Sequence, residues 1–267
     1  MGDNGGDEDE PQAGRPDDQV ADAFSRAVEE GAQRLGRDWA GLAATGAVGG
    51  IDVAFGVFAL LIVEHETGNR LLAALAFGIG FLALTLAGSE LFTENFLVPI
   101  AAVVARRARP VAILRLWLGT AATNLLAGWA LTWLILQGFP ALKPVARETA
   151  RRFVEEGVGG ASFASALLGG ALITLMTWME RSTTSQPARL LAALATAFLL
   201  AAAPLAHVIV ASLELFAGIH AGASFGYLTW AATAAWYTLG NIVGGVGLVT
   251  VLRLVQVGQS KIREESA

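Results

Sequence analysis

The 267-residue sequence contains no cysteine, which excludes disulfide bonds, thiolate metal sites and cysteine nucleophiles. Histidine occurs only three times, and Asp, Glu, Lys and Arg make up 15% of the chain, against roughly 25% in soluble globular proteins. Zinc-protease, nucleophile-elbow, Walker and dinucleotide-binding motifs are missing as well. We therefore expect no enzyme, no cofactor and no metal site.

Apolar residues are abundant instead. They make up 54% of the chain, the mean hydropathy is +0.56, and there are 31 glycines. Glycine is favoured where membrane helices touch, so this composition indicates a protein embedded in a lipid bilayer. The net charge of −5 arises from acidic residues crowded into positions 1–18, which leaves no basic face for nucleic acid.

The pattern along the chain divides it into four regions. Residues 1–18 are rich in Gly and Asp without apolar periodicity, and we expect a disordered acidic tail. Residues 19–37 are predicted to form an amphipathic cytoplasmic helix that lies on the membrane surface or against the bundle. Residues 38–255 form the membrane-spanning domain, and residues 256–267 a cytoplasmic C-terminal tail.

Six apolar stretches lie within the membrane-spanning domain, and a bilayer-spanning helix takes about 20 residues. They lie near 38–63, 70–106, 111–138, 157–179, 190–227 and 228–252. The second and fifth are too long, because a continuous helix of that length would reach ~55 Å across a hydrocarbon core of ~30 Å. We therefore expect both to be broken, bent or partly re-entrant.

Lysine and arginine are distributed unequally between the two sides that six spans create. Most of the 18 lie in the N-terminal region, in the loops after the second and fourth stretches, and at the C-terminus. The positive-inside rule places these regions in the cytoplasm. We therefore expect a multi-pass protein with both termini cytoplasmic.

The two overlong stretches share the tripeptide Glu-Leu-Phe, at residues 90–92 and 214–216. Each copy lies in the second span of a three-span half. Irregular backbone inside a membrane is tolerated where it lines a cavity or is buried in protein. We therefore predict helix breaks near 89–95 and 213–219.

Asn124 and Asn241 form a second echo, because each opens a glycine-containing run in the third span of its half. Since three is an odd number, the two halves insert in opposite orientations, as an inverted repeat. The mirrored asparagines are predicted to bond between helices or to the broken backbone.

The segment Gly88–Thr93 resembles the G-x-E-L-F-T loop of the formate/nitrite transporter family, and Gly240–Gly245 resembles its last-helix motif G-N-I-x-G-G. The likeness covers about 20–255. It implies an all-α membrane protein of aquaporin-like architecture: six transmembrane helices as two inverted three-helix repeats, with broken second and fifth helices. It also implies a homopentamer in the bacterial inner membrane, in which each protomer has its own pore for small monovalent anions.

Three positions depart from the family pattern. The family carries Glu-His at the fifth-helix break, and the matching pair here is Glu214-Leu215, so the histidine central to anion passage is missing. The family's pathway asparagine in the fourth helix falls on Gly170, and the glycine after the loop threonine is Glu94. This pattern suits the divergent YfdC-like branch of the family.

The candidate pore residues lie in and around these motifs. They are Phe77, Phe81, Glu90, Leu91, Phe92, Thr93, Glu94, His207, Glu214, Leu215 and Phe216. The apolar members could form slits that dewet a pore, although Phe77 and Phe81, one turn apart, could simply pack. The Thr93 hydroxyl could donate to an anion or bond the preceding turn.

The acidic candidates have two interpretations. An ionisable group inside a membrane marks a functional site by default, yet Glu90, Glu94 and Glu214 could instead cap the broken helices. An ionised Glu94 beside the path would oppose anions. His207 lies one to two turns before Glu214, so we do not expect it to replace the family histidine. It is interpreted either as a packing residue or as a group in a vestibule.

Three functions compete at this point. The leading hypothesis is a homopentameric channel or transporter for a small monovalent anion or its neutral acid. The alternatives are a pore for water or another neutral solute, favoured by Leu215 and Gly170, and a non-conducting structural or regulatory membrane protein. With Leu215 where the family carries histidine, we expect weak or absent formate conduction. Glycine-rich faces of the first and sixth stretches allow close contact between protomers or within one.

Overall fold

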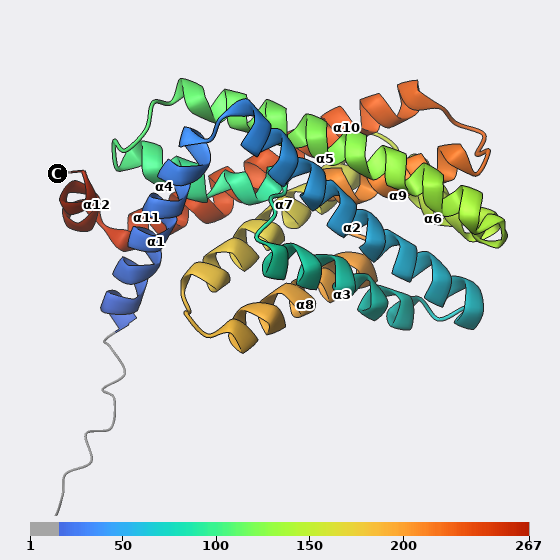
Figure 1. Cartoon of the computed structure of the whole chain (residues 1–267), viewed down its shortest axis with the longest axis horizontal. Helices are drawn as coiled ribbons and strands as arrows, with labels where there is room; N and C mark the ends of the chain where they lie inside the picture. The colour runs from blue at the N-terminus through green and yellow to red at the C-terminus, as the bar shows by residue number, and fades with distance from the viewer. Residues whose placement is uncertain (1–15, 267) are drawn as a thin grey trace, which may run out of the picture.

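The computed structural model describes residues 16–266, and every regular element in this range is a helix (Figure 1). This agrees with the all-α fold expected from the sequence. The predicted acidic tail falls mainly on residues 1–15, which lie outside the described residues. Its last positions begin helix α1 (Pro16–Gly36).

Within the described range, five helices are long and apolar enough to cross a membrane. They are α2 (Trp39–Thr67), α3 (Arg70–Ala87), α5 (Val111–Gly138), α7 (Gly160–Arg181) and the run of α10 (Tyr227–Ile242), η3 (Val243–Thr250) and α11 (Val251–Val257). The shorter apolar helices are η1 (Phe92–Phe96) with α4 (Val98–Val104), α8 (Gln186–Ala202) and α9 (Val208–His220). The remaining helices are η2 (Pro140–Leu142), α6 (Lys143–Glu156) and α12 (Gln259–Glu265).

The two halves of the chain run in opposite directions through the bundle (Figure 1). Helix α2 starts beside α1 and ends beside α6, where Glu64 pairs with Arg152 at 2.8 Å. Helix α7 starts after α6 and ends beside α1, where Arg181 pairs with Glu30 at 2.5 Å. Thus α2 corresponds to α7, the pair α3–α4 to the pair α8–α9, and α5 to the run α10–α11, as an inverted repeat requires.

The first break lies where the sequence predicts it. Helix α3 ends at Ala87 and is capped by Gly88, whose φ of 63° is a left-handed conformation that glycine adopts without strain. Irregular backbone follows, and the 3-10 helix η1 and then α4 continue the chain.

The second break lies upstream of its predicted position. Residues 213–219 are helical inside α9, and the interruption is at 203–207, between α8 and α9. Pro204 explains this position, because its ring cannot continue a helix and it lacks the backbone donor. The tripeptide Glu-Leu-Phe therefore marks a break in the first half only.

Helix α1 packs against the bundle. Phe24 of α1 joins Leu97 and Ala101 of the α4 segment in one buried cluster. The C-terminal region is helical and docked as well, because Ser25 Oγ in α1 donates to Glu265 of α12 at 2.5 Å. Both terminal helices therefore lie at the same end of the bundle.

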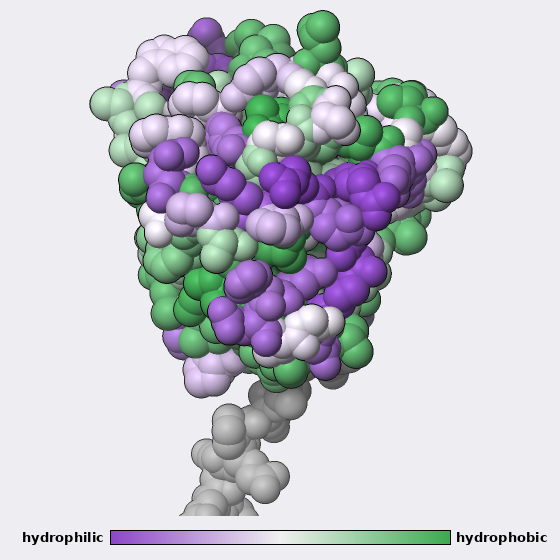
Figure 2. Space-filling model, turned by 90° about the vertical axis from the view of Figure 1, so that its right-hand side faces the viewer, coloured by the Kyte–Doolittle hydropathy of each residue, from purple (hydrophilic) through white to green (hydrophobic). Residues whose placement is uncertain are grey.

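The outside of the bundle is apolar and its α6 end is polar. Leu118 and Leu126 of α5 are 64% and 67% exposed, on a surface that a bilayer would cover. Figure 2 views the end that carries α6, where hydrophilic residues gather in a band with hydrophobic residues on its flanks. On α6, the exposed Arg151 is paired with Glu148 and Glu155. This distribution is typical of a bundle that spans a membrane.

Glycines bring helices of the same chain into backbone contact. A side chain at Gly170 of α7 would collide with the backbone of Asn241 in α10, and Gly50 of α2 stands in the same relation to Asn124 of α5. An asparagine at Gly170, as the family pattern has it, would not fit this contact. At these positions the glycines serve packing within one protomer.

Candidate functional site

Asn124 of α5 holds the ends of the first break. Its Oδ1 accepts from the amide of Phe92 at 2.9 Å, and its Nδ2 donates to the carbonyls of Glu90 at 2.9 Å and Gly46 at 2.6 Å. Backbone groups without partners are costly inside a membrane. This one buried side chain satisfies both sides of the break.

Asn241 of α10 repeats the arrangement at the second break. Its Oδ1 accepts from the amide of Val208 at 2.8 Å, and its Nδ2 donates to the carbonyls of Ala206 at 2.9 Å and Ala166 at 2.6 Å. The repeated asparagine therefore identifies equivalent positions in the two halves. The repeated Glu-Leu-Phe tripeptide does not.

His207 lies at the second break, between the Ala206 carbonyl and the Val208 amide that Asn241 binds. As the N-cap of α9, its Nδ1 accepts from the amide of Val210 at 3.3 Å. Its Nε2 lies 2.6 Å from Oγ1 of Thr93 in η1, and both side chains are fully buried. Because Nδ1 is an acceptor, the ring proton is assigned to Nε2 and points to the Thr93 oxygen. The Thr93 hydroxyl proton is then free for another acceptor.

The structure overturns the expectation that no histidine lies at the fifth-helix break. That expectation aligned Glu214-Leu215 with the break, but both residues lie inside α9. Leu215 packs in the apolar core. His207 occupies the break because Pro204 sets its position.

Two cavities lie at opposite ends of the bundle. The larger, which we call the α1-side vestibule, has a volume of about 650 Å³. Its charged lining residues are Arg26, Arg34, Arg37, Arg181 and Arg189 together with Glu29, Glu30, Glu90, Glu94 and Glu180. The smaller, the α6-side cavity, has a volume of about 20 Å³, and its lining includes Ala73, Pro204, Leu205 and Glu214.

One face of α3 runs from one cavity to the other. Ala73 lines the α6-side cavity, and Leu84 lines the α1-side vestibule. Phe77 and Phe81 lie between them at helical spacing, fully buried, with their ring centroids 5.5 Å apart. The two rings therefore occupy the stretch of α3 that separates the cavities.

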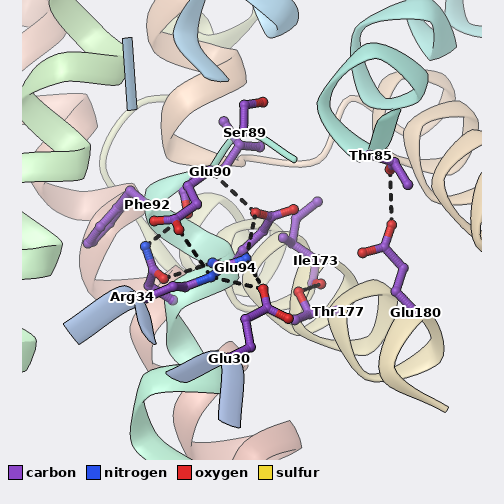
Figure 3. A network of polar contacts seen from close by, with 12 residues as sticks. Glu30, Arg34, Thr85, Ser89, Glu90, Phe92, Glu94, Ile173, Thr177 and Glu180 are labelled. Carbon is purple, nitrogen blue, oxygen red and sulfur yellow. Dashed lines mark hydrogen bonds and ion pairs between the residues drawn. The ribbon is translucent and has the colours of Figure 1, made fainter. Parts of the chain in front are cut away.

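A buried arginine organises the vestibule wall (Figure 3). Arg34 of α1 pairs with Glu30 at 2.6 Å, and it lies 3.2 Å from Glu90 and 3.9 Å from Glu94. It also donates to Oδ1 of Asn95 at 2.9 Å. Burial acts to lower the pKa of Arg34, but the charges of Glu90 and Glu30 outweigh it and raise that pKa. Arg34 is therefore a permanent cation that ties α1 to the first break.

A second arginine, Arg181 at the end of α7, binds Glu30 as well. Its Nε and Nη2 lie 2.5 Å and 2.7 Å from the two carboxylate oxygens. Arg26 supports it, since the Nε of Arg26 donates to the carbonyl of Arg181 at 2.6 Å. Burial acts to raise the pKa of Glu30, but the charges of Arg34 and Arg181 together lower it.

The three predicted carboxylates take different places. Glu94 caps η1, because its Oε2 accepts from the amide of Leu91 at 3.2 Å. Glu90 forms ion pairs with Arg34 and Arg37 of the N-terminal region, so it does not act as the cap we considered. Glu214 lines the α6-side cavity from inside α9, and it cannot cap a break that lies upstream.

The predicted aromatic residues separate into two groups. Phe92 packs edge-on against Phe96 at 5.0 Å and Trp117 at 6.0 Å, next to the first break. Phe216 packs against Trp230 at 4.9 Å and lines a groove on the outside of the bundle. Phe216 is not among the lining residues of either cavity.

The sequence did not single out Arg34, Arg181 or Glu180. Glu180 lies 3.4 Å from Arg181 and accepts from Oγ1 of Thr85 at 3.0 Å. A signal existed for Arg34, because it lies seven residues after the buried Ala27 and therefore on the buried face of α1. Glu180 lies seven residues after the buried Ile173, so the same periodicity placed it on the buried face of α7.

Comparison with known proteins agrees with this architecture. The model of the formate/nitrite transporter family matches residues 21–255. The inner membrane protein YfdC of Escherichia coli (strain K12) is 26% identical over 252 residues, which cover 86% of this chain and 76% of that protein.

Two solved structures share the fold, each at 19% sequence identity. An FNT family ion channel superposes with a TM-score of 0.79 over 86% of this chain and 96% of its own. A pentameric formate channel with formate bound superposes with a TM-score of 0.63 over 89% and 97%. The family match spans most of the sequence and the fold agrees with it, so this chain belongs to the formate/nitrite transporter family.

Proposed function

We propose that this protein is a channel for a small monovalent anion of the formate type, or for its neutral acid, with a pore in each protomer. The observation that carries the proposal is the Thr93–His207 pair. Thr93 precedes Glu94 of the α1-side vestibule, and His207 lies two residues after Leu205 of the α6-side cavity. Two broken helices thus bring hydrogen-bonding groups to the point between two cavities.

The apolar rings favour a substrate that can cross as a neutral, protonated acid. A bare anion that passes the rings of Phe77 and Phe81 would lose hydration in a medium of low dielectric, at a cost of many kcal/mol, whereas its neutral acid would not. The Thr93 hydroxyl would donate to a carboxylate oxygen, and the imidazole of His207 would hold that hydroxyl in position. The vestibule has five arginines and five glutamates in its lining, so it has no strong net field for anions.

Membrane topology and assembly are part of the proposal. We count α3–α4 and α8–α9 each as one interrupted span, which gives six spans over residues 38–255 with both termini in the cytoplasm. The positive-inside rule supports this orientation. The similarity to YfdC, an inner membrane protein, supports a location in the inner membrane. The similarity in fold to a pentameric formate channel supports assembly as a homopentamer.

Purified protein in liposomes tests the proposal. The sequence led us to expect weak or absent formate conduction because Leu215 was aligned with the family histidine. Since His207 lies at the break beside Thr93, we now expect stopped-flow measurement with an internal pH dye to record formate entry well above the rate in empty liposomes. Osmotic swelling with urea, measured on the same preparation, should equal that of empty liposomes. Swelling without formate entry would replace the proposal with a neutral-solute pore, and neither signal would indicate a non-conducting protein.

A further inference from the structure

Glu30 is a carboxylate held where a carboxylate from solution could bind. One oxygen lies 2.6 Å from Nη2 of Arg34 (Figure 3). The same oxygen lies 2.7 Å from Nη2 of Arg181, and the other oxygen lies 2.5 Å from Nε of Arg181. Arg181 thus contacts both oxygens: its Nη2 donates a hydrogen bond to one, and its Nε pairs with the other by charge, without the geometry of a hydrogen bond. The Glu30 side chain is 30% exposed, whereas those of Arg34 and Arg181 are 5% and 10% exposed.

We propose that Arg34 and Arg181 form a binding site for a small monocarboxylate anion, and that Glu30 occupies this site as a tethered competitor. The site opens on the α1-side vestibule, next to the first break. The inference rests on the proposed function, because it assigns the place where the substrate binds before it reaches Thr93 and His207.

Both arginines are fixed independently of Glu30. Arg34 is held on its other side by Glu90 at 3.2 Å and by Asn95 at 2.9 Å. The guanidinium of Arg181 is also paired with Glu180, at 3.4 Å. Donors that are fixed before binding lose little conformational entropy when a ligand arrives. The site therefore remains formed when the Glu30 carboxylate leaves it.

Glu30 lies on α1 one turn before Arg34. A change of the Glu30 rotamer removes its carboxylate from the site, whereas Arg34 on the same helix stays held by Glu90 and Asn95. Because Arg34 and Arg181 lower its pKa, Glu30 is ionised at neutral pH and competes with an external anion. If the site is free for only a tenth of the time, the apparent affinity of that anion is about tenfold weaker than for the free site.

If Glu30 competes with the anion, removal of the Glu30 carboxylate should strengthen the binding of formate. We would titrate detergent-purified, full-length protein with radiolabelled formate. We expect the formate Kd to fall about tenfold in Glu30→Gln. It should stay unchanged in Glu29→Gln, which neutralises the neighbouring, exposed acid of the same helix and vestibule. In the double variant Glu30→Gln with Arg181→Lys, the positive charge remains but the second contacting nitrogen is lost. This variant should therefore lose the gain in formate affinity.

A measurement on the unaltered protein does not depend on whether the variants fold. Saturating formate should speed hydrogen exchange of the α1 amides, because displaced Glu30 no longer holds the helix, and chloride at equal ionic strength should not. Equal formate affinity in folded Glu30→Gln and Glu29→Gln overturns the proposal. If Glu30→Gln does not fold, unchanged exchange in the unaltered protein overturns it.

The two proposals fail in different ways. Tighter formate binding by Glu30→Gln, without formate entry into liposomes, supports the site and contradicts the proposed channel function. Formate entry without tighter binding by that variant supports the channel and overturns the site.

Discussion

At the scale of single residues, Thr93 and His207 have separate tasks. His207 donates to the Thr93 oxygen, and the Thr93 hydroxyl is left to donate to the substrate. We expect Thr93→Val, which is nearly isosteric, to lower formate flux about 10- to 100-fold, because a hydrogen bond to a charged group contributes about 1.5–3 kcal/mol. Stopped-flow flux in liposomes measures the effect.

The control for this variant is Thr67→Val, at the exposed end of α2. It removes the same hydroxyl far from the two breaks and should leave the flux unchanged. Flux of Thr93→Val equal to that of the unaltered protein would show that the substrate passes without using this donor.

Gly170 is a point of close contact between α7 and α10. The family's asparagine does not fit here, because any side chain would meet the backbone of Asn241. We expect Gly170→Ala to lower the free energy of unfolding by about 1–3 kcal/mol, the usual cost of overpacking. Gly160→Ala, at the open start of the same helix, should be neutral. Thermal unfolding in detergent compares the two, and equal midpoints would contradict the close contact.

At the scale of elements, the broken helices depend on the asparagines that bind their ends. Asn124→Ala and Asn241→Ala would each leave one amide and two carbonyls without this partner. An unsatisfied buried group costs about 1–3 kcal/mol, so both variants should be strongly destabilised, and to a similar degree. Urea unfolding tests this, and a large effect of only one variant would contradict the equivalence of the two breaks.

Helix α1 should loosen in acid. A group whose folded pKa is lowered adds stability that is present above its ordinary pKa, 4.5 for glutamate, and is lost as the pH falls through the lowered value. Glu30 is such a group, so hydrogen exchange of α1, corrected for the intrinsic rate, should rise below pH 4.5. In Glu30→Gln this step should be absent. An identical pH profile in both proteins would assign the loosening to other acids.

The elements also show what the sequence could predict. The lengths of the apolar stretches predicted the membrane spans and showed that two of them must be broken. The loop motif that begins at Gly88 predicted the position of the first break. The second was misplaced because a repeated tripeptide was given more weight than Pro204, whose effect on a helix is stronger. The asparagine pair held the better signal: its spacing, applied to the first break, points to the region of His207.

The long-range ion pairs were beyond the sequence for a physical reason. Arg34 and Arg181 meet at Glu30 only because α1 folds back onto the end of α7. Periodicity places a residue on a face of its own helix, but it does not say which helix covers that face.

At the scale of the whole molecule, the inverted repeat leaves the orientation in the membrane to be tested. The absence of cysteine makes the test direct, because any introduced cysteine is unique. Ser266→Cys marks the end of the chain beside α12, and Glu155→Cys marks the exposed surface of α6 at the opposite end of the bundle. Because lysine and arginine favour the α1 end, we expect that end to face the cytoplasm.

A membrane-impermeant maleimide applied to intact spheroplasts should therefore label Glu155→Cys and spare Ser266→Cys. After lysis both should react, which controls for the accessibility of each thiol. The reverse pattern would place the α1-side vestibule, with its Arg34–Arg181 site, outside the cell. The tethered competitor would then act on anions that enter, whereas in the expected orientation it acts on anions that leave.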